Sequence, residues 1–137
     1  MAPGSQSFTV LLADDDNRCR DSLGHLLAGE GFQILSANGG SEALQYLRPT
    51  RPAARRADIL ILDYNMPDLD GLEVLRVVRQ ELRLRIPTIL VSGNASAQLE
   101  TSVLQIGGFA LVPKPIEPIS FRQLVWRLVE TEFPGNC

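Results

Sequence analysis

The sequence has few cysteines and no long apolar run. Its 137 residues contain two cysteines, Cys19 and Cys137, which have neither metal-ligand spacing nor an obvious disulfide partner. The longest early apolar run, residues 8–13, is too short to span a membrane and lacks the basic flank of a signal peptide. We therefore expect a soluble protein that stays in the reducing cytoplasm and does not bind membranes.

The sequence also has fewer basic than acidic residues. Thirteen Lys and Arg residues stand against sixteen Asp and Glu residues, for a formal net charge of -3. This balance disfavours a surface built for direct nucleic-acid binding. With 45% hydrophobic and 21% charged residues, the chain has an ordinary globular composition, and its length suits one domain that buries a core without disulfides or structural metal.

Five short apolar runs alternate with segments of helical period. The runs are typical of buried parallel strands, and they cover residues 8–13, 32–36, 58–62, 87–91 and 109–112. Segments with an apolar stripe at helical spacing follow each run, the last from about Pro118 to Thr131. Five βα units in succession predict a single doubly wound α/β domain, with right-handed crossovers and helices on both faces of a parallel sheet.

The residues that follow the strands are the ones to inspect, because such sheets bind ligands beyond the carboxyl ends of their strands. Those residues are Asp14, Asp15 and Asp16 after the first run, Asp63 after the third, Ser92 after the fourth and Lys114 after the fifth. Carboxylates, a hydroxyl and an ammonium group would thus meet at one edge.

Each of these residues also has an ordinary structural interpretation. Asp16 is expected to cap the first helix, and Asp68 and Asp70 are expected to be turn residues before Gly71. A single serine at a strand end, or a single surface lysine, would be weak evidence for a functional site. Their coincidence at one edge of one predicted sheet favours a functional interpretation of Asp14, Asp15, Asp63 and Lys114, with Ser92 beside them.

The residue types indicate a chemistry. Adjacent carboxylates repel one another and raise each other's pKa unless a cation neutralises them. Oxygen ligands without histidine or thiolate suit Mg²⁺, which takes one or two protein carboxylates together with phosphate oxygens. The carboxylate of Asp63 can accept a phosphoryl group as an acyl phosphate, with Lys114 and Ser92 at the other phosphoryl oxygens.

Four motifs together carry a resemblance to a known family. "LLADDDN", "LDYNMPDLDG", "ILVSGN" and "LVPKPI" resemble, in order and spacing, the receiver domain of two-component response regulators. The resemblance implies the CheY-like, flavodoxin-like (βα)5 fold with a five-stranded parallel sheet of order 2-1-3-4-5. It runs over residues 8–131, so that residues 1–7 form an N-terminal extension and residues 132–137 a C-terminal tail.

By this resemblance Asp63 is the phosphoacceptor of a phosphorelay. It would take its phosphoryl group from a histidine on a sensor histidine kinase or a histidine phosphotransfer protein. Asp14 and Asp15 look like the magnesium-binding pair, and Asp63 and the backbone carbonyl of Asn65 would complete the protein ligands of Mg²⁺. The chain would be a signalling domain rather than an enzyme, with only self-catalysed phosphoryl transfer and autodephosphorylation.

The resemblance also implies a switch. Ser92 looks like the switch hydroxyl, and Lys114 like the lysine that pairs with the acidic pocket, followed by a cis peptide to Pro115. Output would go to a downstream effector protein or domain, and a homodimer would use the face made by the fourth helix, the fifth strand and the last helix. The chain departs from the family at Leu111, where many receivers carry a switch aromatic.

One loop and one tryptophan each have two possible interpretations. The connection from Arg48 to Ala57, "RPTRPAARRA", is expected to be a solvated loop, with a docking site as the less favoured alternative. Trp126 lies off the core stripe of the last helix, so either a partner contact or the edge of the core would explain it.

Three other functions are weighed against the receiver. A haloacid-dehalogenase-type phosphatase needs a second acid two residues after the nucleophile, where this chain has Asn65, and an FMN-binding flavodoxin would be repelled by the acidic triplet. A phosphorylation-independent interaction module with the receiver fold is the more serious alternative. The complete acceptor pocket argues against it.

Overall fold

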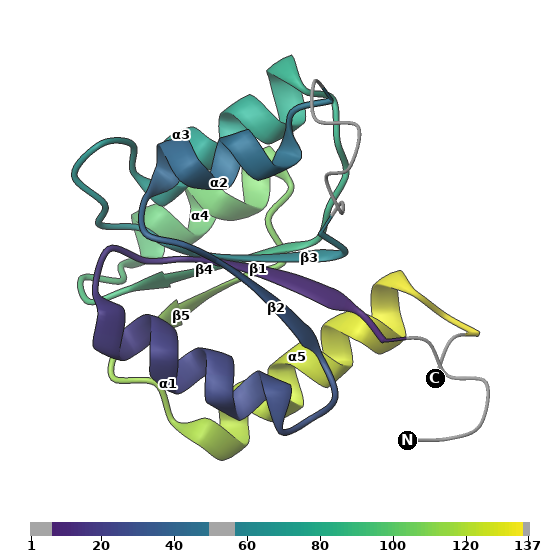
Figure 1. Ribbon diagram of the computed structural model, residues 1–137. Helices are drawn as coiled ribbons and strands as arrows, with labels where there is room; N and C mark the ends of the chain where they lie inside the picture. Colours follow the sequence, from purple (N-terminus) through teal and green to yellow (C-terminus); the bar gives the residue numbers. More distant parts are fainter. Residues whose placement is uncertain (1–6, 50–56, 136–137) are drawn as a thin grey trace.

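The computed structural model describes residues 7–49 and 57–135, which form alternating strands and helices (Figure 1). The strands are β1 (Thr9–Ala13), β2 (Gln33–Ala37), β3 (Ile59–Asp63), β4 (Thr88–Ser92) and β5 (Ala110–Pro113). The helices are α1 (Asn17–Ala28), α2 (Gly40–Leu47), α3 (Gly71–Arg76), α4 (Ala97–Ile106) and α5 (Pro118–Glu132), and a π-helical turn, η1 (Val77–Glu81), continues α3. The predicted arginine-rich loop lies largely outside the described residues.

The five strands form one parallel sheet of order β2-β1-β3-β4-β5, which confirms the predicted fold class. Strands β1, β3 and β4 are buried along their whole length, as their continuous apolar sequences predict. In the register, Ala13 pairs with Leu62, Asp63 with Val91, and Ser92 with Pro113. Each of these strands therefore ends within one residue of its neighbour in the sheet.

Helices cover both faces of the sheet. Figure 1 shows α1 and α5 on one face and α2, α3 and α4 on the other. Each face has its own apolar core: Leu11, Leu60 and Leu90 point to the side of α2, α3 and α4, whereas Val10, Ile59 and Ile89 point to the side of α1 and α5. Alternate strand residues thus serve opposite layers.

Most helix ends are explained by their own sequence. Asp16 caps α1, because its Oδ1 accepts a hydrogen bond of 2.9 Å from the backbone N–H of Arg18, as predicted. Asp70 and Glu73 form a reciprocal capping box at the start of α3. The C-terminal cap of α4 is Gly107, whose φ of 97° lies in the left-handed region that favours glycine.

Helix α2 is capped from another part of the chain. Its own cap residue, Gly39, has no side chain to offer, and Asp68 accepts instead from the N–H groups of Gly40 (3.1 Å) and Ser41 (2.9 Å). These hydrogen bonds, that of Ser41 foremost, lower the pKa of Asp68 to about 2. A Cβ at position 39 would lie 3.0 Å from both carboxylate oxygens, so glycine permits the close approach.

Trp126 lies at the edge of the core. Its ring centroid is 5.0 Å from that of Phe32, and its indole N–H donates a hydrogen bond of 2.9 Å to Glu30 Oε1. The half-buried indole thus joins α5 to the end of α1, and of its two sequence interpretations the structure favours the core edge.

Candidate functional site

The carboxyl ends of four strands bring the sequence-predicted residues to one edge of the sheet. Asp14 follows the last residue of β1, Asp63 and Ser92 are the last residues of β3 and β4, and Lys114 follows the last residue of β5. In Figure 1 the strands run from right to left, so this edge is on the left. The parallel register is what makes positions far apart in the sequence neighbours in space.

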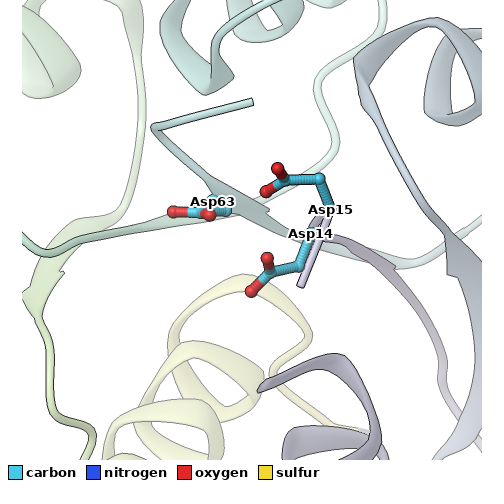
Figure 2. Close-up of side chains that lie close together, drawn as sticks. All are labelled: Asp14, Asp15 and Asp63. Atoms are coloured by element: carbon cyan, nitrogen blue, oxygen red, sulfur yellow. The ribbon is translucent and has the colours of Figure 1, made fainter. Parts of the chain in front are cut away.

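Three carboxylates gather at this edge. One oxygen from each of Asp14, Asp15 and Asp63 can be chosen so that all three lie within 4.8 Å of one another (Figure 2). Asp14 and Asp63 are each 5% exposed, whereas Asp15 is open to solvent. The backbone N–H of Asp16 donates a hydrogen bond of 2.9 Å to Asp14 Oδ1, and Asp15 has no partner among the described residues.

The ammonium group of Lys114 lies between the two buried carboxylates. Its Nζ is 3.4 Å from Asp63 Oδ2 and 3.5 Å from Asp14 Oδ2. The backbone fixes this position, since the N–H of Lys114 donates to the carbonyl of Ser92 at 2.9 Å, and the Lys114–Pro115 peptide bond is cis as expected.

The charges at this edge shift each other's protonation. Burial and the neighbouring Asp14 raise the pKa of Asp63 to about 6, against the opposing effect of Lys114 and of the hydrogen bond from the Asn65 N–H. Burial alone would lower the pKa of Lys114, but the carboxylates of Asp14 and Asp63 outweigh it and raise that pKa. The pocket therefore carries excess negative charge that one lysine offsets only in part.

Two further predicted residues lie beside Asp63 or at the end of the neighbouring strand β4. Ser92 is fully buried, and its Oγ accepts a hydrogen bond of 3.1 Å from the N–H of Asn94. The N–H of Asn65 donates to Asp63 Oδ1 at 3.4 Å, which places the backbone of Asn65 beside Asp63. Asn65 is therefore adjacent to the Asp63 carboxylate, and Ser92 ends the strand that pairs with β3.

Sequence reasoning gave no role to two residues that shape the site. The Arg20 Nη1 donates a hydrogen bond of 2.6 Å to the carbonyl oxygen of Asp14, and Nη2 donates to Asn17, so α1 is fixed to the strand end. A Cβ on Gly71 would lie 2.6 Å from the carbonyl oxygen of Asp63, so only glycine lets the loop after β3 return to that strand. For Gly71, the glycine at the end of the "DLDG" motif is the feature of the sequence that could have indicated this role.

The donor set fits a hard divalent cation. Carboxylate oxygens make up the cluster, one of them on an exposed and unpartnered side chain, and no thiolate or imidazole belongs to it. Mg²⁺ keeps several waters and takes few protein carboxylates, so an acidic group open on one side matches its requirements. The arrangement can hold a cation next to a buried carboxylate that also contacts an ammonium group.

A five-stranded parallel sheet of this order, with acidic side chains and a lysine at its carboxyl edge, defines the CheY-like class of α/β domain. The sequence profile of the response regulator receiver domain matches residues 10–125. The chain belongs to the receiver-domain family of two-component signal transduction.

Individual proteins show the same relationship. The chain is 32% identical over 135 residues to the DNA-binding transcriptional regulator NtrC of Escherichia coli (strain K12), covering 96% of this chain and 28% of that protein. A receiver domain protein from Methanospirillum hungatei shares the fold, with a TM-score of 0.82 at 24% identity and coverage of 93% and 97% of the two chains. A chain in the CheX-CheY-BeF3-Mg complex from Borrelia burgdorferi gives a TM-score of 0.79 at 28% identity, with 88% of each chain covered.

The match to full-length regulators covers only part of them. The chain spans between 25% and 45% of the curated relatives that it matches. Within the described residues, no helix is both long and apolar enough to cross a membrane.

Proposed function

We propose that this chain accepts a phosphoryl group on Asp63, in a magnesium-dependent reaction, from a phosphohistidine of a sensor histidine kinase or histidine phosphotransfer protein. One observation carries the proposal: Lys114 Nζ lies within 3.5 Å of both Asp14 and Asp63, in a pocket that also contains the carboxylate of Asp15. Family membership, and with it a role in two-component signalling, makes phosphoryl transfer the natural use of this geometry.

The reaction needs Asp63 as a carboxylate. One of its oxygens attacks the phosphorus atom, the bond between phosphorus and the imidazole nitrogen breaks, and its electron pair stays on that nitrogen. Lys114 favours the ionised form of Asp63 and stabilises the negative charge of the transferred group. Phosphoryl transfer depends mainly on the positions of the reacting groups and on the stabilisation of charge. The buried end of β3 supplies most of both.

Mg²⁺, when bound, would neutralise charge on the phosphoryl oxygens. Asp14, Asp15, Asp63 and the backbone carbonyl of Asn65 are the residues proposed to hold it. Asp15 is the side chain best placed to take the cation directly, because it is exposed and has no partner in the described part of the chain. Asp14 is already engaged by Lys114 and by the N–H of Asp16.

Ser92 is proposed as the switch. Its hydroxyl would leave the hydrogen bond with Asn94 and contact a phosphoryl oxygen on Asp63. The exposed residues Gly93 to Ser96, which join β4 to α4, would follow that movement and change the surface that an effector recognises. A ligand changes output only by biasing such a two-state element.

The proposed partners are a phosphohistidine donor and a downstream effector protein or domain, in the cytoplasm, without direct binding of nucleic acid or membranes by this domain. The α4-β5-α5 face is the proposed surface for a homodimer. The alternative, a receiver-fold module that signals without phosphorylation, would leave the acidic pocket without a use.

Intact-mass measurement tests the proposal. After incubation with acetyl phosphate and Mg²⁺, the wild-type chain should gain the mass of one phosphoryl group, and the Asp63→Ala variant should gain none. Asp21→Ala is the matched control, because Asp21 is an exposed carboxylate on α1 outside the site. A wild-type chain that stays unmodified would favour the phosphorylation-independent module.

A further inference from the structure

A cavity lies far from Asp63, where η1, the segment between η1 and β4, the end of α4 and the end of α5 meet. Its volume is about 940 Å³, and we call it the basal cavity. Arg79, Arg83 and Arg85 supply its cationic lining, Glu132 its carboxylate, and the half-buried Ile106 and Phe133 part of its apolar surface. It is open to solvent, and its residues take no part in the site at the carboxyl edge.

Hydrogen bonds to backbone carbonyls hold the side chain of Arg79 in the wall of the cavity. Its Nη1 donates a hydrogen bond of 3.1 Å to the carbonyl of Leu84, and its Nη2 donates to the carbonyls of Ile86 (2.8 Å) and Gly107 (3.1 Å). The half-buried guanidinium thus joins the segment before β4 to the end of α4. Burial, and then the nearby Arg85, lower the pKa of Arg79, so a second cation is held beside the first.

The backbone that presents the other two arginines is unusual. The π-helical turn Val77–Glu81 replaces the regular end of α3, and such turns are frequent at functional sites. Arg83 then has a φ of 55°, the only positive φ of a non-glycine residue within residues 7–49 and 57–135. An arginine is a costly choice for that conformation, which suggests that its side chain is needed there.

The cationic side chains are not neutralised within the described part of the chain. Arg83 and Arg85 are exposed and make no ion pair with any described residue, and Glu132 is the one carboxylate in the cavity lining. Three guanidinium groups therefore face one carboxylate on a chain whose formal net charge is -3. Guanidinium groups bind carboxylates in a planar, two-pronged geometry.

We propose that the basal cavity binds an acidic segment of a partner protein, with carboxylates on Arg83 and Arg85 and an apolar side chain of the segment against the half-buried Ile106 and Phe133. Charge complementarity identifies the partner's chemistry. The breadth and openness of the cavity fit an extended peptide better than an enclosed small molecule. Glu132 in the lining disfavours a polyphosphate, because it would repel closely spaced phosphate groups.

Fluorescence anisotropy tests this proposal with a labelled peptide in which glutamates flank one leucine. The double variant Arg83→Gly with Arg85→Gln removes both free cations, and glycine suits the positive φ at position 83, so the fold should be retained. We expect its dissociation constant to rise about tenfold or more, as for the loss of charge-assisted hydrogen bonds. Arg76→Gln is the control, since Arg76 is exposed on α3 outside the cavity lining, and it should change affinity by less than about twofold.

Three results would overturn the proposal. The wild-type chain could fail to bind the peptide at low salt, or Arg76→Gln could weaken binding as much as the double variant, which would indicate only diffuse electrostatics. Tighter binding of a single-stranded oligonucleotide of equal charge would assign the cavity to nucleic acid instead. Circular dichroism and phosphoryl uptake at Asp63, both expected to be unchanged in the double variant, exclude unfolding as the cause of a loss.

Discussion

Lys114 Nζ lies 3.4 Å from Asp63 Oδ2, although fifty-one positions (114 minus 63) separate the two residues in the sequence. The contact exists because β3 and β5 flank β4 in one parallel sheet and each of these strands ends within one residue of its neighbour. It joins a carboxylate with a raised pKa to the cation that offsets its charge.

Without metal, we expect Asp63→Asn to stabilise the fold at neutral pH. Because the folded pKa of Asp63 is about 6 and its ordinary value is 3.8, the wild type loses stability as pH rises through this window. The variant should gain roughly 1–2 kcal/mol above about pH 7, and the gain should shrink as pH falls towards about pH 4. Urea unfolding in EDTA measures it, with Asp21→Asn as control. A variant less stable than wild type at neutral pH would contradict the electrostatic account.

The two neighbouring aspartates should differ in their effect on metal binding. Asp15→Asn is expected to raise the Mg²⁺ concentration at half-saturation by about tenfold or more, because its free carboxylate is the proposed direct ligand. Asp14→Asn should have a smaller effect, since the carboxylate of Asp14 already contacts Lys114 and the N–H of Asp16. Calorimetric titration of each variant measures this. Equal losses, or none, would refute the assignment.

Asp68 should stabilise α2 from a distance. Replacing it by alanine removes the side-chain cap that Asp68 gives to that helix and should cost about 0.5–2 kcal/mol at neutral pH. Because the folded pKa of Asp68 is about 2 and its ordinary value is 3.8, this contribution is complete above about pH 4 and lost as pH falls towards 2. Unfolding curves for Asp68→Ala and Asp21→Ala across that range provide the comparison. If the difference in the free energy of unfolding did not change with pH, the negative charge of Asp68 would not contribute to the cap.

These caps show where sequence reasoning reached its limit. The strands were predictable because residues buried on both faces give continuous apolar runs, and Asp16 was predictable as a cap because its hydrogen bonds are local. Asp68 was predictable only as a turn residue, since its partners Gly40 and Ser41 lie 28 and 27 positions away in the sequence. Local patterns carry no information about such a contact.

The sequence could likewise predict only part of the candidate site. Asp14, Asp63 and Lys114 could be placed together because strand ends define one edge of a parallel sheet. The role of Arg20, which donates to the carbonyl of Asp14, and the π-helical end of α3 depend on packing that no periodicity encodes. In the structure α3 ends at Arg76, and η1 follows it directly at Val77.

Phosphorylation should change the β4–α4 loop more than β5. Leu111 has no hydroxyl with which to hydrogen-bond a partner, and it packs against the core on the side of α4. Hydrogen exchange with and without beryllofluoride, an acyl-phosphate mimic, should therefore show altered protection in residues 93–96 and at the start of α4. The coupling should be modest, on the order of 1–3 kcal/mol. A dominant change around Leu111 would contradict this route.

Localisation of the acyl phosphate shows directly whether Asp63 is the phosphoacceptor. Borohydride reduces an aspartyl phosphate to homoserine, so treatment of the chain after acetyl phosphate and Mg²⁺, followed by proteolysis and tandem mass spectrometry, marks the acceptor. We expect homoserine at position 63 in the wild type and none in a sample prepared without Mg²⁺. Homoserine at Asp14 or Asp15 in place of Asp63, or no reduced residue at all, would contradict it.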